Sequence, residues 1–307
     1  MFYPTLPPSK YQRFGGKWTK KKLEVLGKYL NAYTQALKNQ SFQLLYIDAF
    51  AGYGRTYLKN IASRKESSFF EDSVGQEELA FIDGSARIAL KVSRPFSSYY
   101  FIELDSQKCE SLESLKAEFP TLSDRINIIQ GDANQAVKKL CRSMSWRDQR
   151  AVLFLDPLGA QVEWNTVEDI AKTGAIDLWW LFPLGAINRL LCRSKQKIPG
   201  TWKDRITRVF GTDKWEEKFY SSKKIIQKDL WNRPEESKLK KNADFKILID
   251  FTMKRLKEIF PAILENPPIL RNSKGSPLFL LCFAVGNPSA KAQKVALRIA
   301  RSNIKGI

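Results

Sequence analysis

The stretch Leu44-Leu-Tyr-Ile-Asp-Ala-Phe-Ala-Gly-Tyr-Gly-Arg55 decides how the rest of this chain is interpreted. An apolar run ends at Asp48 and is followed by Gly52 and Gly54, which predicts a buried strand that leads into a glycine turn. Glycines at the carboxyl end of a strand let main-chain N–H groups approach a ligand, because no side chain blocks the way. The same pattern also occurs in purely structural turns, so this segment alone predicts a strand and a turn.

The chain is strongly basic. Its 307 residues include 51 Lys and Arg against 32 Asp and Glu, which gives a formal net charge of +19. Such a charge attracts polyanions, so we expect nucleic acid as the first partner and an anionic membrane surface as the second, with a merely basic soluble protein as the alternative. Because 43% of the residues are hydrophobic, the chain can form one large domain, or one domain with an insert.

The sequence contains no histidine. This excludes a Ser-His-Asp triad, a Cys-His pair and a His-ligated zinc site. The N-terminus lacks the apolar core of a signal peptide and no uncharged apolar stretch is long enough to span a membrane, which predicts a cytoplasmic protein with no membrane partner. The cysteines form no CxxC array, so we expect buried thiols in a reducing compartment and no metal site. They are Cys109, Cys141, Cys192 and Cys282.

Four further apolar runs are predicted to be strands, at residues 99–105, 126–130, 151–155 and 176–182. Predicted helices alternate with these strands, and the first of them has an apolar stripe from Leu23 to Leu37 with Thr19 as its N-cap. Asp105 is expected to cap the helix after the second strand, and Asn165 with Glu168 has the spacing of a capping box. The alternation predicts an α/β fold with a mostly parallel, doubly wound sheet that is covered on both faces.

Acidic side chains follow four of the predicted strands. Ligands of parallel sheets bind beyond the carboxyl ends of the strands, so these side chains are expected to share one site. Chance is the alternative, because aspartate is also a good helix cap. The acids are Asp48 after the first strand, Glu103 and Asp105 after the second, Asp132 after the third and Asp156 after the fourth.

Residues 195–270 break the alternation of strands and helices. Three helices are expected there, at 202–210, 213–220 and 244–260, and lysines are dense from 223 to 246. We predict a helical basic insertion, with residues 1–194 forming the N-terminal helix and a Rossmann-like core, and residues 271–307 completing that core with a strand and a helix. Residues 56–78 are expected to be an inserted loop. Trp202, Trp215 and Trp231 are interpreted as core residues, with base stacking as the alternative.

The glycine turn favours a ligand without phosphates. A nicotinamide dinucleotide site would need a third glycine at the start of a helix, whereas Arg55, Thr56 and Tyr57 follow Gly54. S-adenosylmethionine fits better. Its methionine part can lie on the first turn, its ribose on an acid after the second strand, and its adenine amino group on an acid after the third.

The segments 48–54, 101–105 and 131–133 resemble the first three motifs of class I S-adenosylmethionine-dependent methyltransferases. The resemblance implies the Rossmann-like class I methyltransferase fold. It also implies that the glycine turn approaches the methionine part, that Glu103 holds the ribose, and that Asp132 and the Ala133 N–H bind the adenine. The cofactor-binding residues would then be Asp48, Ala49, Phe50, Gly52, Gly54, Glu103, Leu104, Asp132 and Ala133.

Across nearly the whole chain the sequence also resembles the three-Cys-motif partner proteins (TcmP), within the same superfamily. The segments that carry this resemblance are 46–52, 154–157, 162–164 and 181–185, with Asn188-Arg189. That family is bacterial and phage-associated, methyltransferase-like, and found beside a radical-type protein. The resemblance implies a role in bacterial or phage defence and a three-Cys-motif partner protein.

Asp156-Pro157 lies where amino-methyltransferases carry an Asp/Asn-Pro-Pro-aromatic motif. In that motif the carboxylate accepts a hydrogen bond from the amino group of a flipped base. Leu158 and Gly159 replace the second proline and the aromatic residue here, so a ring nitrogen or a hydroxyl acceptor stays open as well. Methylation at carbon five of a pyrimidine is disfavoured, because none of the four cysteines follows a proline.

These observations are compatible with three functions. The first is methyl transfer to nucleic acid, with Asp156 and Pro157 at the reacting atoms. The second is a binding subunit that keeps the cofactor fold and has lost the chemistry. The third, a nuclease, ranks last because no Asp…Glu-x-Lys metal cluster is evident. The phosphates of a nucleic acid would be held by Lys20, Lys21, Lys22, Lys238, Lys240 and Lys241.

Overall fold

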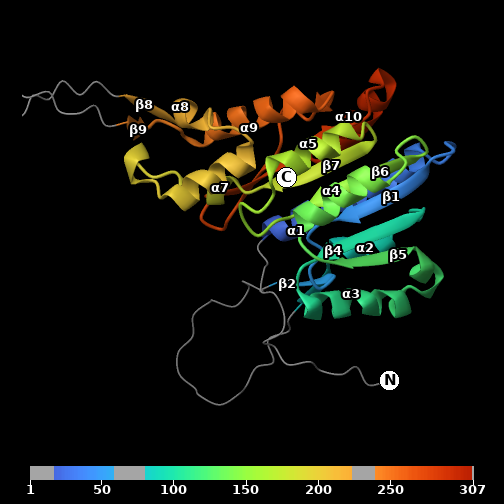
Figure 1. Cartoon of the computed structure of the whole chain (residues 1–307). Helices are drawn as coiled ribbons and strands as arrows, with labels where there is room; N and C mark the ends of the chain where they lie inside the picture. The colour runs from blue at the N-terminus through green and yellow to red at the C-terminus, as the bar shows by residue number, and fades with distance from the viewer. Residues whose placement is uncertain (1–16, 59–79, 223–238, 306–307) are drawn as a thin grey trace, which may run out of the picture.

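The computed structural model describes residues 17–58, 80–222 and 239–305. A central sheet of eight strands dominates it, and five of these are parallel to one another (Figure 1). The predicted α/β fold with a mostly parallel, doubly wound sheet is therefore confirmed. In order across the sheet the strands are β5 (Ile126–Gln130), β4 (Ser98–Glu103), β1 (Gln43–Asp48), β6 (Gln149–Leu155), β7 (Ile176–Phe182), β12 (Pro277–Val285) and β10 (Ala262–Ile263), and β11 (Ile269–Arg271) also pairs with β12.

The parallel strands run in register, which brings their carboxyl ends to one edge. Asp48 at the end of β1 pairs with Phe101 of β4 and with Phe154 of β6. Every residue of β7 is buried, as expected for a strand covered on both faces. β12 runs antiparallel to β7, so it begins at the edge where the parallel strands end.

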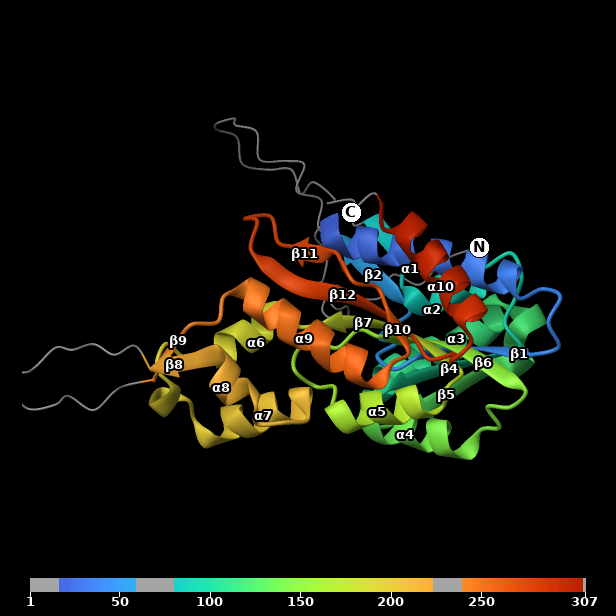
Figure 2. The same ribbon diagram turned by 90° about the horizontal axis from the view of Figure 1, so that it is seen from above.

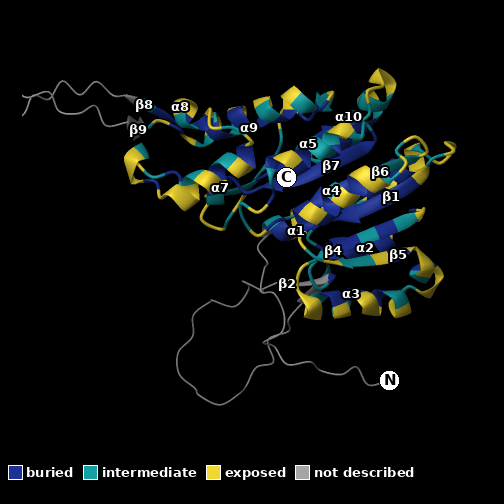
Figure 3. Cartoon of the chain, viewed as in Figure 1, coloured by how far each residue is buried: buried dark blue, intermediate teal, exposed yellow. Residues whose placement is uncertain are grey.

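Helices cover both faces of the sheet (Figures 1 and 2). Figure 3 shows that their inward sides are buried and their outward sides exposed. One core cluster packs α1 (Lys17–Ala36), α2 (Ser85–Leu90), α3 (Ser106–Glu118) and α10 (Ala290–Asn303) on the first face. The other cluster packs α4 (Ala133–Ser143), α5 (Trp164–Lys172), α6 (Leu184–Leu190), α7 (Gly200–Phe210), α8 (Trp215–Phe219) and α9 (Phe245–Ile259) on the second face.

An aromatic triangle holds α7, α8 and α9 together. The ring centroid of Phe251 lies 5.0 Å from that of Phe210 and 5.1 Å from that of Phe219. Phe210 also contacts Phe182 of β7, at 5.7 Å, so this packing is continuous with the core of the sheet. Trp215 is buried as predicted, and its indole N–H donates to Thr207 at 2.9 Å. Trp202 is exposed, so its interpretation as a core residue is wrong, and Trp231 lies outside the described residues.

Several local predictions were wrong. α1 begins at Lys17, so Thr19 lies within the helix and is not its N-cap. α5 begins at Trp164 with Glu163 as its N-cap, which removes the predicted capping box at Asn165. In contrast, Asp105 caps α3 as expected, by accepting a hydrogen bond from the Lys108 N–H at 3.1 Å.

Short elements escaped the sequence patterns. The predicted loop at 56–78 begins within β2 (Arg55–Leu58), which pairs with β3 (Ala80–Asp83) after the loop, and residues 59–79 lie outside the described part of the chain. Within the described residues, no helix combines the length and apolar character needed to cross a bilayer. The remaining short elements of the described residues are the antiparallel pair β8 (Tyr220–Ser222) and β9 (Leu239–Lys241) and two 3₁₀ helices, Pro120–Arg125 and Lys195–Lys197.

Candidate ligand site at the carboxyl edge of the sheet

A cavity of about 710 Å³ opens at the edge where the parallel strands end. It is lined by residues that follow β1, β4, β5 and β6, and by residues from the first turns of α1 and the beginning of β12. Of the predicted cofactor-binding residues, all except Asp48 line the cavity, and both predicted catalytic residues do so too. These lining residues are Ala49, Phe50, Gly52, Gly54, Glu103, Leu104, Asp132, Ala133, Asp156 and Pro157.

The glycine turn after β1 has a left-handed backbone. Gly52 has a φ of 62° and Gly54 a φ of 68°, values that strain any residue with a side chain. The turn is held from two sides, because the Ala51 N–H donates to the Ile102 carbonyl of β4 at 3.1 Å and the Gly54 carbonyl accepts from the Gly84 N–H at 3.0 Å. The main chain therefore passes along the cavity in a fixed conformation.

Glu103 is fixed at the tip of β4. One carboxylate oxygen accepts from the N–H groups of Leu104 and Asp105, at 3.0 and 3.1 Å. The other accepts from the Gly52 N–H at 3.0 Å, so Glu103 links the end of β4 to the glycine turn. The Lys108 ammonium lies 3.6 Å away. Three N–H groups do not exhaust the lone pairs of a carboxylate, so Glu103 can still accept hydrogen bonds from hydroxyl groups in the cavity.

Asp132 begins α4 at the tip of β5. Its Oδ1 accepts from the Gln135 N–H at 3.0 Å, which caps the helix. Its Oδ2 accepts no hydrogen bond from a described residue, and the side chain is exposed. Ala133 is buried beside it, and Leu104 at the rim of the cavity is 68% exposed. An exposed apolar side chain and a carboxylate oxygen without a described partner, in the lining of one cavity, suit a flat ring with a polar edge.

Asp48 lies beneath the glycine turn and is fully buried. Its Oδ1 accepts from the Phe50 N–H at 3.3 Å, and the Tyr46 hydroxyl lies 3.4 Å from Oδ2. Burial raises the pKa of Asp48 to about 7, and the negative charge of Asp156 acts in the same direction. The structure thus places Asp48 as a support for the turn and not in the cavity wall.

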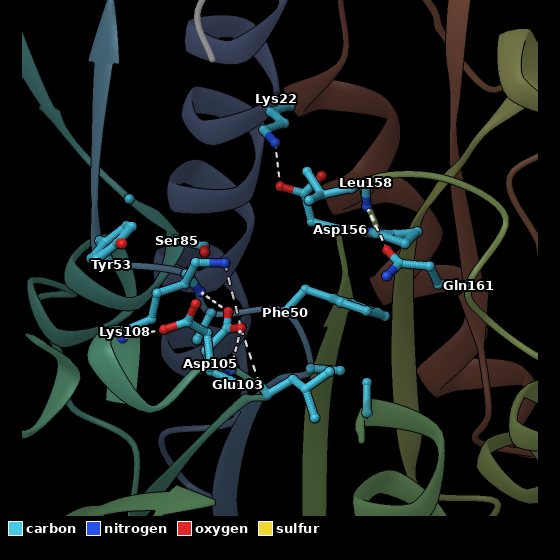
Figure 4. Close-up of a pocket in the computed structure, with 18 of the residues that line it drawn as sticks. Lys22, Phe50, Tyr53, Ser85, Glu103, Asp105, Lys108, Asp156, Leu158 and Gln161 are labelled. Atoms are coloured by element: carbon cyan, nitrogen blue, oxygen red, sulfur yellow. Dashed lines mark hydrogen bonds and ion pairs between the residues drawn. The ribbon is translucent and has the colours of Figure 1, made fainter. Parts of the chain in front are cut away.

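Asp156 at the tip of β6 forms an ion pair with Lys22 of α1. Both side chains are largely buried, and they are 21% and 8% exposed, respectively. The Lys22 ammonium also lies 5.1 Å from the centre of the Trp18 ring. The predicted contact between Lys22 and phosphates is wrong, because the turn of the helix points this side chain inward to Asp156. Figure 4 shows this pair on the opposite side of the cavity from Glu103 and Lys108.

The other lysines that were predicted to contact phosphates lie in different environments. Lys20 and Lys21 are exposed on α1. Lys241 is a structural residue: its ammonium donates to the side-chain and main-chain oxygens of Asn188, at 2.6 and 3.2 Å, and burial lowers its pKa. The prediction for Lys241 is therefore wrong. Lys238 and the side chain of Lys240 lie outside the described residues.

The cavity contains residues that the sequence patterns missed. Trp18 of α1 and Phe279 of β12 line it, with ring centroids 5.0 Å apart. Thr19 also lines it, and its buried hydroxyl has no hydrogen-bond partner among the described residues. Gln161 accepts from the Leu158 N–H at 2.9 Å and so fixes the loop after Asp156. Helical phase could have found Trp18, Thr19 and Lys22, because they share the inward face of α1 with Leu26.

The cavity favours a cationic ligand. Among the described residues, four carboxylates line it, those of Glu103, Asp105, Asp132 and Asp156, against the two ammonium groups of Lys22 and Lys108. An anionic pyrophosphate would meet repulsion there. In the described part of the chain, no group of three or more His, Cys, Asp or Glu residues is arranged to hold a metal ion.

Comparisons with known proteins give similarities of fold at low identity. No protein family matches the chain, and no curated protein matches its sequence. A protein from Legionella pneumophila of solved structure is 12% identical over 92% of this chain and 93% of that chain, with a TM-score of 0.45. A putative S-adenosyl-L-methionine-dependent methyltransferase from Methanococcus maripaludis is 13% identical over 89% and 96%, with a TM-score of 0.32.

A third similar structure is a putative methyltransferase from Escherichia coli. It is 13% identical over 56% of this chain and 74% of that chain, with a TM-score of 0.30. Similarities of this size concern the general fold and decide neither ligand nor reaction. Membership of the three-Cys-motif partner family stays a prediction.

Proposed function

We propose that this protein binds S-adenosylmethionine at the carboxyl edge of its sheet and transfers the methyl group to nucleic acid. One observation carries the proposal: a single acid-lined cavity joins the left-handed glycine turn, the fixed carboxylate of Glu103 and the free oxygen of Asp132 to a second carboxylate, Asp156, on its far side. The first three can hold a nucleoside with a cationic tail, and the fourth can serve an acceptor.

The residues present fit the parts of the cofactor. The glycine turn offers unobstructed main chain to the methionine part, and Glu103 retains lone pairs for the ribose hydroxyls. Leu104 gives an apolar surface to the adenine, whose amino group can donate to Asp132. S-adenosylmethionine carries a sulfonium and an ammonium against one carboxylate, so its net charge is complementary to a cavity in which carboxylates outnumber ammonium groups.

Asp156 would act on the acceptor. When bound, S-adenosylmethionine supplies a methyl group that its sulfonium already activates. The acceptor nitrogen or oxygen would bond to the methyl carbon as the carbon–sulfur bond breaks, and Asp156 would take the proton that the acceptor loses. The ion pair with Lys22 holds this carboxylate in one orientation. Positioning and one proton acceptor suffice for such a transfer, which suits a chain without histidine.

Nucleic acid is the acceptor that the charge supports. A formal net charge of +19 favours a polyanionic partner, and Lys20 and Lys21 are exposed on the helix that also contributes Lys22 to the cavity. A second function, a subunit that binds S-adenosylmethionine without catalysis, is favoured by the engagement of Asp156 with Lys22 and by the absence of a proline and an aromatic residue after Pro157.

Calorimetric titration of the purified protein tests the proposal. We expect S-adenosylmethionine and its demethylated product to bind at one site per chain, and NAD to give no heat because its pyrophosphate is repelled. Transfer of labelled methyl groups to cellular RNA and DNA then separates the two functions. Cofactor binding without transfer supports the binding subunit, and a well-folded protein that binds neither cofactor contradicts both.

A further inference from the structure

The C-terminal part of the chain carries positive charge and contains no acid of its own. From residue 266 to residue 307 the sequence contains no Asp or Glu. Four of its cations lie in α10 with spacings of three, four and three residues, which places them on one face of the helix. All four are exposed, and none forms an ion pair with a described residue. This α10 stripe consists of Lys291, Lys294, Arg298 and Arg301.

The opposite face of the sheet is different. There Arg142 of α4 pairs with Asp169 at 2.8 Å, and Lys138 pairs with Glu163 at 2.9 Å. Cations spaced three or four residues apart on a helix repel one another by a few tenths of a kcal/mol per pair. On α10 no ion pair with a described residue offsets this repulsion, so the stripe is suited to an external anion.

The α10 stripe leads to the cavity. The Trp18 ring of α1 contacts Phe279 near the start of β12, and the Tyr29 ring contacts Phe283 further along, at 5.0 Å, so α1 runs in the same direction as β12. α10 follows β12 and returns along α1, which brings Arg301 to the edge of the sheet that holds the cavity. Figure 2 shows α10 beside α1, with the end of α10 toward the beginning of α1. Lys20 and Lys21 are exposed at that end.

We propose that the α10 stripe binds the sugar-phosphate backbone of a nucleic acid and guides it to the cavity. Lys291 and Arg301 are ten residues apart, about 15 Å along a helix, which corresponds to about four nucleotides of one strand. The guidance of the strand to the cavity rests on the proposed methyl transfer to nucleic acid. The binding of phosphates to the α10 stripe does not depend on that transfer. The surface would hold phosphates without reading the sequence of bases.

Nucleic acid fits the stripe better than an anionic membrane does. A helix that lies on a bilayer inserts large apolar side chains beside its cations. In the described part of the chain, the exposed large hydrophobic residues are Leu104, Leu158 and Trp202, and none of them belongs to α10. The exposed face of α10 is therefore suited to electrostatic contact alone.

A pair of matched variants tests the proposal. The stripe variant replaces Lys291, Lys294, Arg298 and Arg301 with Gln, and the control variant replaces four exposed lysines of α4 and α9, namely Lys139, Lys246, Lys254 and Lys257, with Gln. Binding of a fluorescein-labelled strand of about 20 nucleotides, single or in duplex, is followed by anisotropy between about 50 and about 200 mM salt. The stripe variant should bind the strand at least about tenfold more weakly. The slope of the logarithm of affinity against the logarithm of salt concentration should be smaller in magnitude by about 3. The control variant should keep the slope of the unchanged protein.

Three results would overturn the inference. The first is a loss of strand affinity in the control variant that equals or exceeds the loss in the stripe variant. The second is no binding of the strand by the unchanged protein at low salt. The third is a stripe variant that still binds the strand but no longer binds vesicles containing phosphatidylserine. Titration of both variants with S-adenosylmethionine separates this inference from the proposed function. If the stripe governs strand binding in a protein that binds no cofactor, the surface is supported and methyl transfer is not.

Discussion

The two walls of the cavity are built in different ways. The turn wall consists of Gly52, Gly54, Glu103 and Asp132, which lie at the ends of strands or shortly after them, and the main-chain N–H of Gly52 donates to the Glu103 carboxylate. The helix wall consists of Trp18, Thr19, Lys22, Asp156 and Phe279, which come from three separate segments. Lys22 and Asp156 meet across 134 residues of sequence. The turn wall therefore depends on backbone geometry and the helix wall on side-chain charge, and mutations should affect them differently.

The largest effect is expected from Gly54→Leu in the turn wall. A side chain at a φ of 68° costs about 1–2 kcal/mol, and a Cβ there would lie 3.5 Å from Leu115 and 3.6 Å from Leu112 of α3. The bulk of a leucine must therefore displace the turn or α3. We expect S-adenosylmethionine binding to fall at least about a hundredfold by calorimetry, a loss of about 2.7 kcal/mol.

Gly275→Leu is the matched control for Gly54→Leu. Gly275 has a φ of 78°, and no heavy atom lies within 4 Å of the position that a Cβ would take there, so a side chain meets the backbone strain alone. This variant should lose a similar amount of stability in chemical denaturation and keep its affinity for the cofactor. Equal loss of affinity in both variants would mean that general destabilisation, and not the shape of the turn wall, controls binding.

A smaller and more selective effect is expected from Lys22→Met in the helix wall. Methionine keeps the length of the side chain and removes the ammonium that holds Asp156. Methyl transfer to cellular RNA or DNA should fall about tenfold to a hundredfold, with the affinity for S-adenosylmethionine within about threefold, and Lys22→Arg should restore part of the activity. The pKa of Asp48, already raised to about 7 by burial, should rise further because the ammonium favoured its charged form.

Lys28→Met is the control on the same helix, because Lys28 is exposed and its partner among the described residues is Glu24, four residues before it. It should leave both cofactor binding and transfer unchanged. If Lys22→Met weakens cofactor binding as strongly as Gly54→Leu does, the two walls do not act separately. Undiminished transfer by Lys22→Met would remove Lys22 from the positioning of Asp156.

The difference between the walls also explains what the sequence could predict. Glu103 and Asp132 stand next to apolar runs, so their place at one edge follows from local patterns and the rule that parallel strands end together. Lys22 stands in a run of lysines, and only the phase of α1 against the sheet decides that it turns inward while Lys20 and Lys21 turn outward. Phe279 reaches the cavity because β12 runs antiparallel to β7, and that direction is set by tertiary pairing.

The smallest effect concerns the anchor of α1, which carries the helix wall. The Tyr29 hydroxyl donates to the buried Asp177 of β7 at 2.8 Å, and burial raises the pKa of Asp177 to about 7. An unfolded aspartate titrates near about 3.9, so the folded protein holds this proton more tightly. The contribution of Asp177 to stability is then fully present below about pH 4 and is lost as the pH rises to about 7.

Asp177→Asn removes this titration and leaves an oxygen that can accept from Tyr29. The free energy of unfolding, measured in denaturant between about pH 4.5 and about pH 8, should fall less steeply with pH than in the unchanged protein. Because Asp177 lies under α1 and away from the cavity, cofactor affinity should stay constant. A changed affinity would show that the position of α1 affects cofactor binding by the turn wall. Among the described side chains, the Tyr29 hydroxyl is the hydrogen-bond partner of the Asp177 carboxyl. An unchanged pH profile would therefore mean that other groups or water solvate this carboxyl in the folded protein.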